Sequence, residues 1–357
     1  MYKSGVFFKL ISFILPLVFV FPLSADAAPS VSAKSAILIN AQNGDVITEY
    51  NADEKRGMAS TTKIMTAIVA IENGNLNQKY TVPDAAIGIE GSSLYLKKGE
   101  QLTLHELLVG LMLRSANDAA EAIAIIIGGS VENFVNMMND KAQALGLGDT
   151  HFTNPHGLAN DNHYTTAREL ATITAFALKN DTFKDICSIK SAELPGTEYP
   201  RIVANHNKLL SIYDGAYGVK TGFTKATGRC LVSAANRNGV DLIAVTLSAP
   251  DDWNDHTALL DYGFSLYESV TLAPANKKIY DLPILGGDAE FVSLYIKNNI
   301  TATVKKKRGS IVERVELVRP KFAPVYQDDE LGRIVFLLDG IEIASAPLYA
   351  SVYVGRK

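Results

Sequence analysis

Two residues with complementary chemistry lie three positions apart in the segment Ala59-Ser60-Thr61-Thr62-Lys63. The apolar residues that follow indicate a buried helix, and positions i and i+3 share a face of a helix. The Ser60 hydroxyl and the Lys63 amine are therefore predicted to be neighbours. A serine hydroxyl needs an adjacent base to act as a nucleophile near neutral pH. The pair indicates nucleophilic catalysis, and the alternative is an N-cap serine beside a surface lysine.

The predicted base imposes a second requirement on the chain. The amine of Lys63 can accept a proton near neutral pH only if its pKa falls below the usual value of about 10.4. Burial or another cation nearby would lower that pKa. Free backbone N–H groups at the start of the helix would also stabilise a developing oxyanion. We therefore expect a second buried cation close to Ser60.

A polar junction interrupts two apolar helical stretches, 104–113 and 119–127. It contains Ser115 and Asn117, whose side chains would both reach a cleft at such a junction. There Ser115 would relay a proton, and the amide of Asn117 would hold a substrate carbonyl or amide. The alternative is that Ser115 and Asp118 only cap the two helices.

The second cation is found in the segment Lys220-Thr221-Gly222. Strand-like runs follow it at 230–235 and 240–248, so Lys220 is expected on or beside a strand of the same sheet. Gly222 would let a ligand approach the backbone closely.

The elements that must position these groups follow from local signals. Asn43-Gly44 between two apolar runs predicts a β-hairpin before the Ser60 helix. Thr103 with Glu106 forms a capping box for the helix over 104–113. Further predicted elements are helices over 131–145 and 166–178, the second capped by Thr166, and a strand over 204–210.

Composition describes an ordinary globular protein of two domains. The chain has 357 residues, of which 47% are hydrophobic and 20% charged. A net charge of -4 disfavours nucleic acid as a partner and gives no reason to expect a generally basic, membrane-binding surface.

Residues 1–28 have the pattern of a signal peptide. Lys3 and Lys9 flank its start, an apolar run extends from Leu10 to Leu23, and cleavage is predicted near Ala27-Ala28. An uncleaved anchor is the competing interpretation, although the run is short for a spanning helix. Either interpretation places the body of the protein outside the cytoplasm.

The cysteines and histidines show no metal-ligand spacing, so no metal and no cofactor are predicted. Cys187 and Cys230 are interpreted as separate buried thiols, although the exported location would permit a disulfide. His151, His156 and His163 lie in or near a loop rich in turn-forming residues. We interpret them as structural histidines, with a catalytic base or a metal site as the alternative.

Taken together, the three motifs S-x-x-K, S-x-N and K-T-G occur once each and in this order. The chain thereby resembles the low-molecular-mass penicillin-binding proteins, specifically the serine D-alanyl-D-alanine carboxypeptidases, over residues 30 to 355. The resemblance implies an α/β (α+β) catalytic domain of the penicillin-binding and β-lactamase type, with a helical cluster on an antiparallel sheet. A small all-β domain would follow it.

The resemblance also implies roles for the residues of the first two motifs. Ser60 would attack the carbonyl of the penultimate D-alanine in a peptidoglycan stem peptide and release the terminal D-alanine. Lys63 would be the general base, Ser115 would belong to the proton relay, and Asn117 would hold the peptide. Water would then hydrolyse the acyl-enzyme.

The third motif would complete the substrate site. Lys220 and Thr221 would bind the terminal carboxylate, and Gly222 and Phe223 would line the site. The backbone N–H groups of Ser60 and Phe223 would form the oxyanion hole. β-Lactam antibiotics would inhibit the enzyme by mimicking the D-alanyl-D-alanine amide.

Some residues depart from related enzymes. The middle motif reads S-A-N, where β-lactamases carry S-D-N, and no E-x-x-L-N segment supplies a deacylating glutamate. The nearest candidate, Glu169, is interpreted as an ordinary helix residue. Phe223 follows the K-T-G motif where some family members carry histidine. An endopeptidase, a β-lactamase, and a wall-binding or β-lactam-sensing protein remain as alternative functions.

The predicted domains are a signal peptide (1–28), a catalytic domain (29–272) and a β-rich domain (273–357). Asp339-Gly340 predicts a hairpin in the last of these, and Lys305–Gly309 is interpreted as a solvated hairpin tip, with contact to anionic wall polymer or lipid as the alternative. Tyr349–Val354 alternates like a strand and does not resemble an amphipathic membrane helix, which leaves membrane contact open. Strands are expected over 291–297, 300–304, 312–318, 333–338 and 341–346.

Overall fold

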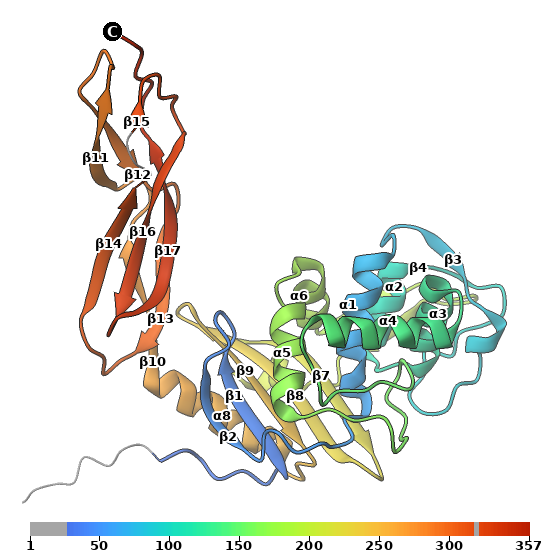
Figure 1. Ribbon diagram of the computed structural model, residues 1–357. Helices are drawn as coiled ribbons and strands as arrows, with labels where there is room; N and C mark the ends of the chain where they lie inside the picture. The colour runs from blue at the N-terminus through green and yellow to red at the C-terminus, as the bar shows by residue number, and fades with distance from the viewer. Residues whose placement is uncertain (1–26, 318–320) are drawn as a thin grey trace, which may run out of the picture.

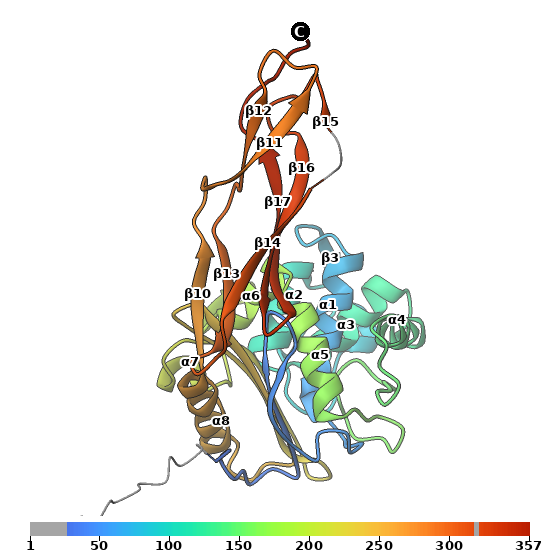
Figure 2. The ribbon, with the colours of Figure 1, turned by 60° about the vertical axis from the view of Figure 1, so that its left-hand side comes forward.

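The computed structural model describes residues 27–317 and 321–357. The predicted signal peptide thus lies almost wholly outside the described residues. The described chain forms a broad body of helices around a sheet, from which a long, narrow arm of strands projects (Figures 1 and 2). The chain reaches its C-terminus at the far end of this arm. A helical cluster on an antiparallel sheet, followed by an all-β unit, is the fold class expected from the sequence.

A five-stranded antiparallel sheet with the order β2-β1-β9-β8-β7 lies at the centre of the body. The first two strands form the hairpin that Asn43-Gly44 predicts, and Gly44 adopts a positive φ of 79° in its turn. The five strands are β1 (Ser35–Asn40), β2 (Val46–Tyr50), β7 (Ala216–Thr224), β8 (Gly228–Arg237) and β9 (Val240–Leu247).

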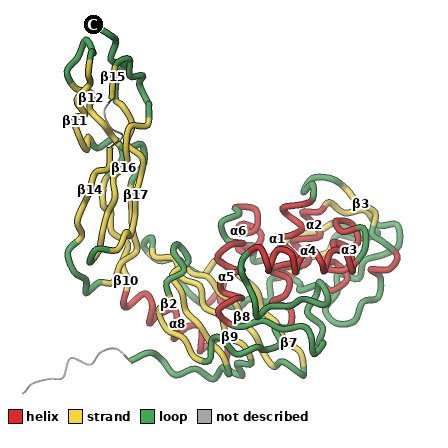
Figure 3. The backbone as a smooth tube through the Cα atoms, viewed as in Figure 1, coloured by secondary structure: helices red, strands yellow, loops and turns green. Residues whose placement is uncertain are grey.

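Both faces of this sheet are covered, because successive side chains of its inner strands point to opposite sides and are buried on both. On β1, Ile37 and Ile39 pack into the large core beneath the helical cluster, whereas Leu38 packs into a smaller core beneath α8 (Asp252–Leu266). Figure 3 shows the helical cluster and α8 on opposite sides of the sheet.

Five of the six helices of the cluster match predicted segments, and the sixth, α6, was not predicted. Thr103 and Glu106 form the predicted capping box at the start of α2, and Thr166 caps α5 by accepting a hydrogen bond from the backbone N–H of Glu169. The cluster consists of α1 (Lys63–Asn73), α2 (Leu104–Leu113), α3 (Asn117–Gly128), α4 (Val131–Ala144), α5 (Ala167–Ala177) and α6 (Asp181–Ser188).

The predicted strand over 204–210 is wrong. A short hairpin of β5 (Ser191–Leu194) and β6 (Arg201–Ala204) ends at this point, and the chain turns into the helical turn α7 (Leu209–Ile212). Asn207 causes the turn, because its side chain accepts a hydrogen bond from the N–H of Leu209 and donates one to the carbonyl of Gly218.

The arm has a hydrophobic core of its own, separate from the two cores of the body. Its two sheets are the pair β10-β13 and a six-stranded sheet with the order β14-β16-β17-β12-β11-β15. Three strands of the arm, β10, β11 and β15, were not predicted. The arm strands are β10 (Tyr267–Ala273), β11 (Lys278–Leu285), β12 (Phe291–Tyr295), β13 (Ile300–Lys305), β14 (Ile311–Leu317), β15 (Lys321–Phe322), β16 (Glu330–Leu338) and β17 (Ile341–Ala350).

Two predictions for the arm are corrected. The segment Lys305–Gly309 is exposed as expected but is no hairpin tip, because β13 pairs with β10 whereas β14 pairs with β16. Within it, the N–H of Lys306 donates to the carbonyl of Leu266, so the segment contacts the end of α8. A strand was expected over Tyr349–Val354, but only Tyr349 and Ala350 lie in one, at the end of β17. The remaining residues are irregular, apart from an isolated bridge at Val354.

Candidate active site

Ser60 lies in a short 3-10 turn, Ala59–Thr62, that leads directly into α1. The first residue of α1 is Lys63, and its side chain is fully buried, with 0% of its surface exposed. The interpretation as an N-cap serine beside a surface lysine is therefore wrong. The apolar run after Lys63 buries the first two turns of α1, and this fixes the amine inside the protein.

The amine of Lys63 faces three oxygens. Its Nζ lies 3.0 Å from Ser60 Oγ, 2.7 Å from Asn117 Oδ1 and 2.6 Å from the backbone oxygen of His156. The amide of Asn117 is oriented by its own Nδ2, which donates to the backbone carbonyl of Glu90 at 2.5 Å. The structure thus brings together residues that are 54 and 93 positions from Lys63.

The pKa of Lys63 lies well below its usual value. Burial of the amine is the main cause, and the positive charge of Lys220 adds to it, whereas the carboxylate of Asp118 acts in the opposite direction. A neutral amine has two N–H donors and one lone pair. The oxygens of Asn117 and His156 can only accept, so they take the two donors and the lone pair faces the hydroxyl of Ser60. This arrangement suits proton transfer from Ser60 to Lys63.

Lys220 lies on β7 and is 1% exposed, so it is the buried cation that the sequence analysis expected. Its Nζ donates to the carbonyl of Thr221 at 2.9 Å. Burial lowers the pKa of Lys220 to about 7, and the nearby thiol of Cys187 acts in the opposite direction. The K-T-G strand therefore places an ionisable cation close enough to Lys63 to lower its pKa.

Glycines allow the backbone segments around Ser60 to approach one another. A Cβ atom on Gly222 would lie 3.0 Å from the backbone N of Ser60 and 3.1 Å from the Cβ of Ala59. Gly157, at a φ of 90°, lies so close to Ala59 that a Cβ would be 2.0 Å from its carbonyl oxygen. Gly222 was expected to make room for a ligand, and in the structure it makes room for the Ser60 turn itself.

Ser115 and Asn117 lie at the junction of α2 and α3. Ser115 has a positive φ of 60° and lines the same cavity as Ser60. The N-cap residue of α3 is Ala116, which makes no side-chain cap bond, so the interpretation of Ser115 as a helix cap is wrong. Ser115 and Asn117 therefore face the site from the helical side, opposite β7.

Asp118 has a structural role that the sequence analysis missed. Its carboxylate accepts hydrogen bonds from the backbone N–H groups of Leu94 and Leu96 and from the hydroxyl of Ser93, at 2.6 to 3.1 Å. It also accepts one from the N–H of Ala119. The carboxylate thereby holds the loop around Ser93 against the start of α3.

The histidines near the site make structural hydrogen bonds, as expected. His163 is buried, with Nε2 2.7 Å from Thr62 Oγ1 and Nδ1 accepting from the N–H of Thr153. His151 bonds to the backbone carbonyl of Asn162. Burial lowers the pKa of His156 to about 3 and that of His163 to about 4, so both rings are neutral near pH 7.

The remaining expectations concern groups away from Ser60. Cys187 and Cys230 are both buried free thiols, as predicted. Glu169 lies in the first turn of α5 and accepts hydrogen bonds from the N–H of Asp149 and the hydroxyl of Thr150. Its role is structural, as expected.

A cavity of about 360 Å³ opens over Ser60. Phe223, at its edge, is 63% exposed. Sequence reasoning missed several of the lining residues. Arg229 was detectable as a charge directly before the apolar run that begins at Cys230, whereas no local signal marks the others. The missed residues are Ser92, His206, Lys208, Arg229, Asp252 and Trp253.

Arg229 is held in place at the edge of this cavity. Its Nη2 lies 2.8 Å from Asp252 Oδ1, and its guanidinium lies over the ring of Trp253 at 5.6 Å from the ring centre. Both partners lie in the first turn of α8, so α8 positions a cation at the cavity that Ser60 lines.

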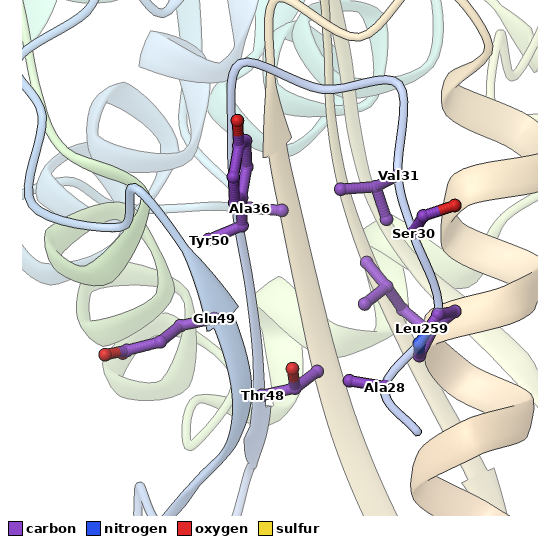
Figure 4. A pocket seen from close by; sticks show the side chains of 9 residues that line it. Ala28, Ser30, Val31, Ala36, Thr48, Glu49, Tyr50 and Leu259 are labelled. Carbon is purple, nitrogen blue, oxygen red and sulfur yellow. The ribbon is translucent and has the colours of Figure 1, made fainter. Parts of the chain in front are cut away.

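Another cavity, of about 350 Å³, lies between the first described residues, β2 and α8 (Figure 4). Its lining includes Val31, Ala36, Thr48 and Leu259, and it contains no residue of the three motifs.

Within residues 27–317 and 321–357, no group of three or more histidine, cysteine, aspartate or glutamate side chains could hold a metal ion. Over the same ranges, every helix is too short or too polar to cross a membrane.

Two family profiles match the chain. The family described as D-alanyl-D-alanine carboxypeptidase matches residues 23–251. The family described as penicillin-binding protein 5, C-terminal domain, matches residues 267–356.

Individual relatives are similar over most of the chain. D-alanyl-D-alanine carboxypeptidase DacF of Bacillus subtilis is 33% identical over 329 residues, which cover 89% of this chain and 85% of the relative. DacA of Escherichia coli, which has the same description, is 33% identical over 90% of this chain and 83% of its own. The crystal structure of penicillin binding protein 5 from Haemophilus influenzae superposes with a TM-score of 0.71 at 31% identity, covering 92% of this chain and 99% of that one.

Proposed function

The chain belongs to the D-alanyl-D-alanine carboxypeptidase family of serine peptidases, and we propose that Ser60 is its nucleophile. The family predicted from the three motifs is thereby confirmed. The proposed substrate is a peptidoglycan stem peptide that ends in D-alanyl-D-alanine, from which the enzyme removes the last residue. The observation that carries the proposal is the contact of 3.0 Å between Ser60 Oγ and the buried amine of Lys63.

In the proposed reaction, Lys63 takes the proton of Ser60 as its oxygen attacks the carbonyl of the penultimate D-alanine. Two backbone N–H groups, those of Ser60 and Phe223, would stabilise the oxyanion that forms. The proton then passes through Ser115 to the leaving amine, and terminal D-alanine departs. Water hydrolyses the ester on Ser60 and completes the cycle.

Substrate recognition is proposed to use both walls of the cavity. The ammonium of Lys220 and the hydroxyl of Thr221 would bind the terminal carboxylate, because a charged hydrogen bond to a carboxylate is about twice as strong as a neutral one. Asn117 would hold the peptide amide from the opposite wall. Gly222 keeps the strand close enough to Ser60 for both contacts to form.

β-Lactam antibiotics are the proposed inhibitors, because their strained amide would leave an ester on Ser60 that water removes slowly. Glu169 is the nearest candidate for the deacylating glutamate of a β-lactamase, but its carboxylate holds the loop around Thr150 instead. This structural role supports a carboxypeptidase over a β-lactamase. As the substrate lies in the cell wall, we also propose that the enzyme works outside the cytoplasm.

The test is release of free D-alanine from diacetyl-lysyl-D-alanyl-D-alanine by protein that lacks residues 1–28. We expect release by the wild type and its loss, by a factor of about 10⁴ or more, in Ser60→Ala. Covalent labelling by a fluorescent penicillin should disappear in the same variant. Labelling that persists in Ser60→Ala would contradict the nucleophile assignment. Stable labelling of the wild type without release of D-alanine would instead favour a β-lactam sensor.

A further inference from the structure

The peptide group between Ala59 and Ser60 lies between two glycines on opposite sides of it. Gly157 faces its carbonyl, since a Cβ atom on this glycine would be 2.0 Å from the oxygen of Ala59. Gly222 faces the other side, since a Cβ atom there would be 3.0 Å from the backbone N of Ser60. In a planar trans peptide the C=O and N–H groups point in opposite directions. The N–H of Ser60 therefore points toward β7, where the proposed oxyanion hole lies.

The carbonyl of Ala59 is fixed by a hydrogen bond from the side chain of Thr62. The hydroxyl oxygen of Thr62 lies 2.7 Å from that carbonyl oxygen, and Thr62 is only 1% exposed, so water does not compete for the bond. Ala59 has a positive φ of 47°, a conformation that an alanine keeps only when its surroundings hold it there. Because the peptide group is rigid, the bond that fixes the carbonyl also fixes the direction of the Ser60 N–H.

A buried histidine decides which way the hydroxyl of Thr62 points. The backbone N–H of Thr153 can only donate, and it lies 3.0 Å from Nδ1 of His163, so this ring nitrogen accepts. The ring is neutral near pH 7 and then carries its hydrogen on Nε2, which donates to Thr62 Oγ1 at 2.7 Å. Since Thr62 Oγ1 accepts this bond, its own hydrogen points away from the ring and toward the carbonyl of Ala59. The hydrogen bonds thus run in one direction, from Thr153 through His163 and Thr62 to Ala59.

These groups act on the site from behind the nucleophile turn. Of the described residues, those that line the Ser60 cavity include neither Thr62 nor His163, so neither would touch a substrate. The ring of His163 also packs edge-on against Phe152, with 5.8 Å between the ring centres, and this contact restricts its rotation. We propose that His163 and Thr62 are positioning residues that aim the N–H of Ser60 into the oxyanion hole. The inference rests on the proposed function, in which this N–H stabilises the oxyanion.

Such positioning should affect the chemical step and not the binding of substrate. The N–H of Ser60 bonds most strongly to the oxygen that becomes negative in the transition state. Removal of one donor from an oxyanion hole lowers the rate by a factor of about 10² to 10³, and a misdirected donor should lose part of that factor. The contacts proposed to bind the substrate come from Asn117, Lys220 and Thr221, which take no part in this chain of hydrogen bonds.

The test uses pairs of substitutions that differ in one hydrogen-bonding group. Thr62→Val keeps the shape of the side chain without the hydroxyl, whereas Thr62→Ser keeps the hydroxyl. His163→Asn places its amide near the position of Nδ1 only, whereas His163→Gln is long enough to reach the position of Nε2 and donate to Thr62. The control is Thr174→Val, because Thr174 is also buried and its hydroxyl also donates to a backbone carbonyl at 2.7 Å, but within α5.

Two measurements separate positioning from a general loosening of the fold. The first is release of D-alanine from diacetyl-lysyl-D-alanyl-D-alanine. We expect kcat to fall about tenfold or more in Thr62→Val and His163→Asn, with KM within about twofold of the wild type. The second is the infrared carbonyl band of the ester that penicillin forms on Ser60. This band should move to higher wavenumber in the same two variants, because the carbonyl accepts a weaker hydrogen bond.

The matched variants should behave differently. Thr62→Ser, His163→Gln and Thr174→Val should resemble the wild type in both measurements. The double variant of Thr62→Val with His163→Asn should be no slower than the slower of the two single variants, because the histidine acts through the threonine. Circular dichroism checks that each variant is folded, and the two His163 variants decide the test if Thr62→Val does not fold.

Each result has a defined meaning. A carbonyl band that stays in place in folded Thr62→Val or His163→Asn would overturn the inference. Thr62→Ser as slow as Thr62→Val, or a loss of activity that lies in KM alone, would also overturn it and leave the proposed function intact. A wild type that forms no ester with penicillin and releases no D-alanine would instead contradict the proposed function.

Discussion

At the scale of single residues, Lys63 and Lys220 are two buried lysines for which we propose different roles. Both lose positive charge more easily than a lysine in water, because both are buried. The neutral form suits Lys63, whose lone pair faces Ser60. The charged form suits Lys220, which we propose binds a carboxylate. Activity therefore requires Lys63 neutral and Lys220 charged at the same pH.

This division predicts the pH profile of kcat/KM for D-alanine release. The pKa of Lys220 in the free enzyme is about 7, so its charge is present below that pH and is lost above it. We expect kcat/KM to fall as the pH rises through this value, by up to tenfold per pH unit. In Lys220→Arg the guanidinium stays charged to above pH 12, so the alkaline fall should disappear while the acid side of the profile remains.

The profile is measured from pH 5 to 10 with the diacetyl-lysyl peptide, on the wild type and Lys220→Arg side by side. An unchanged alkaline fall in Lys220→Arg would show that another group controls it. Lys208→Arg is the matched control, because Lys208 lines the same cavity but is not proposed to bind the carboxylate.

At the scale of elements, the junction of α2 and α3 supports both the surroundings of Lys63 and the loop around Ser93. Its neighbouring residues Asn117 and Asp118 serve different purposes: the first faces Lys63, and the second holds the loop around Ser93. The backbone N–H of Asn117 also donates to the carbonyl of Ser92 at 2.7 Å. A change at Asp118 should therefore affect both stability and the position of the site.

We predict that Asp118→Asn lowers the free energy of unfolding by about 1.5 to 3 kcal/mol, because a hydrogen bond to a charged group contributes about that much. One carboxylate oxygen would be replaced by an N–H₂ group that faces other donors. Urea unfolding measures the change. Asp84→Asn is the control, since its bond to Lys98 lies at the surface and should contribute little to stability. Equal effects of the two substitutions would contradict the structural role of Asp118.

At the scale of the whole molecule, the arm and the body have separate hydrophobic cores. In the described part of the chain, polar contacts between them include two from Lys306 to the carbonyls of Leu266 and Phe264 at the end of α8, and one from Thr303 to Gln42 in the β1-β2 turn. The residues that line the Ser60 cavity all precede the arm. The arm therefore contributes no group to the chemistry on a small peptide.

Accordingly, a chain shortened after Tyr267 should fold and retain D-alanine release to within about threefold, because a unit with its own core can fold alone. Tyr267 is kept because it packs into the core beneath α8. Circular dichroism and release from the diacetyl-lysyl peptide are the two measurements. A folded but inactive product would show that the arm shapes the active site. An unfolded product would show that the two units depend on each other for stability.

Much of this architecture is encoded in short stretches of sequence. Asn43-Gly44 predicts its hairpin, and Thr103 with Glu106 predicts the start of α2, because each signal acts between residues close in the chain. The apolar run after Lys63 predicts a buried helix for the same reason, and the spacing of three places Lys63 beside Ser60. Each of the three motifs is a weak local pattern by itself. Their occurrence together and in this order predicts the family.

Other features depend on contacts between distant segments, and only the folded chain decides them. The carbonyl of His156 and the amide of Asn117 orient Lys63 from 93 and 54 residues away. Arg229 lines the cavity because α8 supplies its partner Asp252. The predicted strand at 204–210 failed because Asn207 bonds to the carbonyl of Gly218. Sequence periodicity reports which face of an element is buried, whereas the identity of the atoms that meet there depends on how the elements pack.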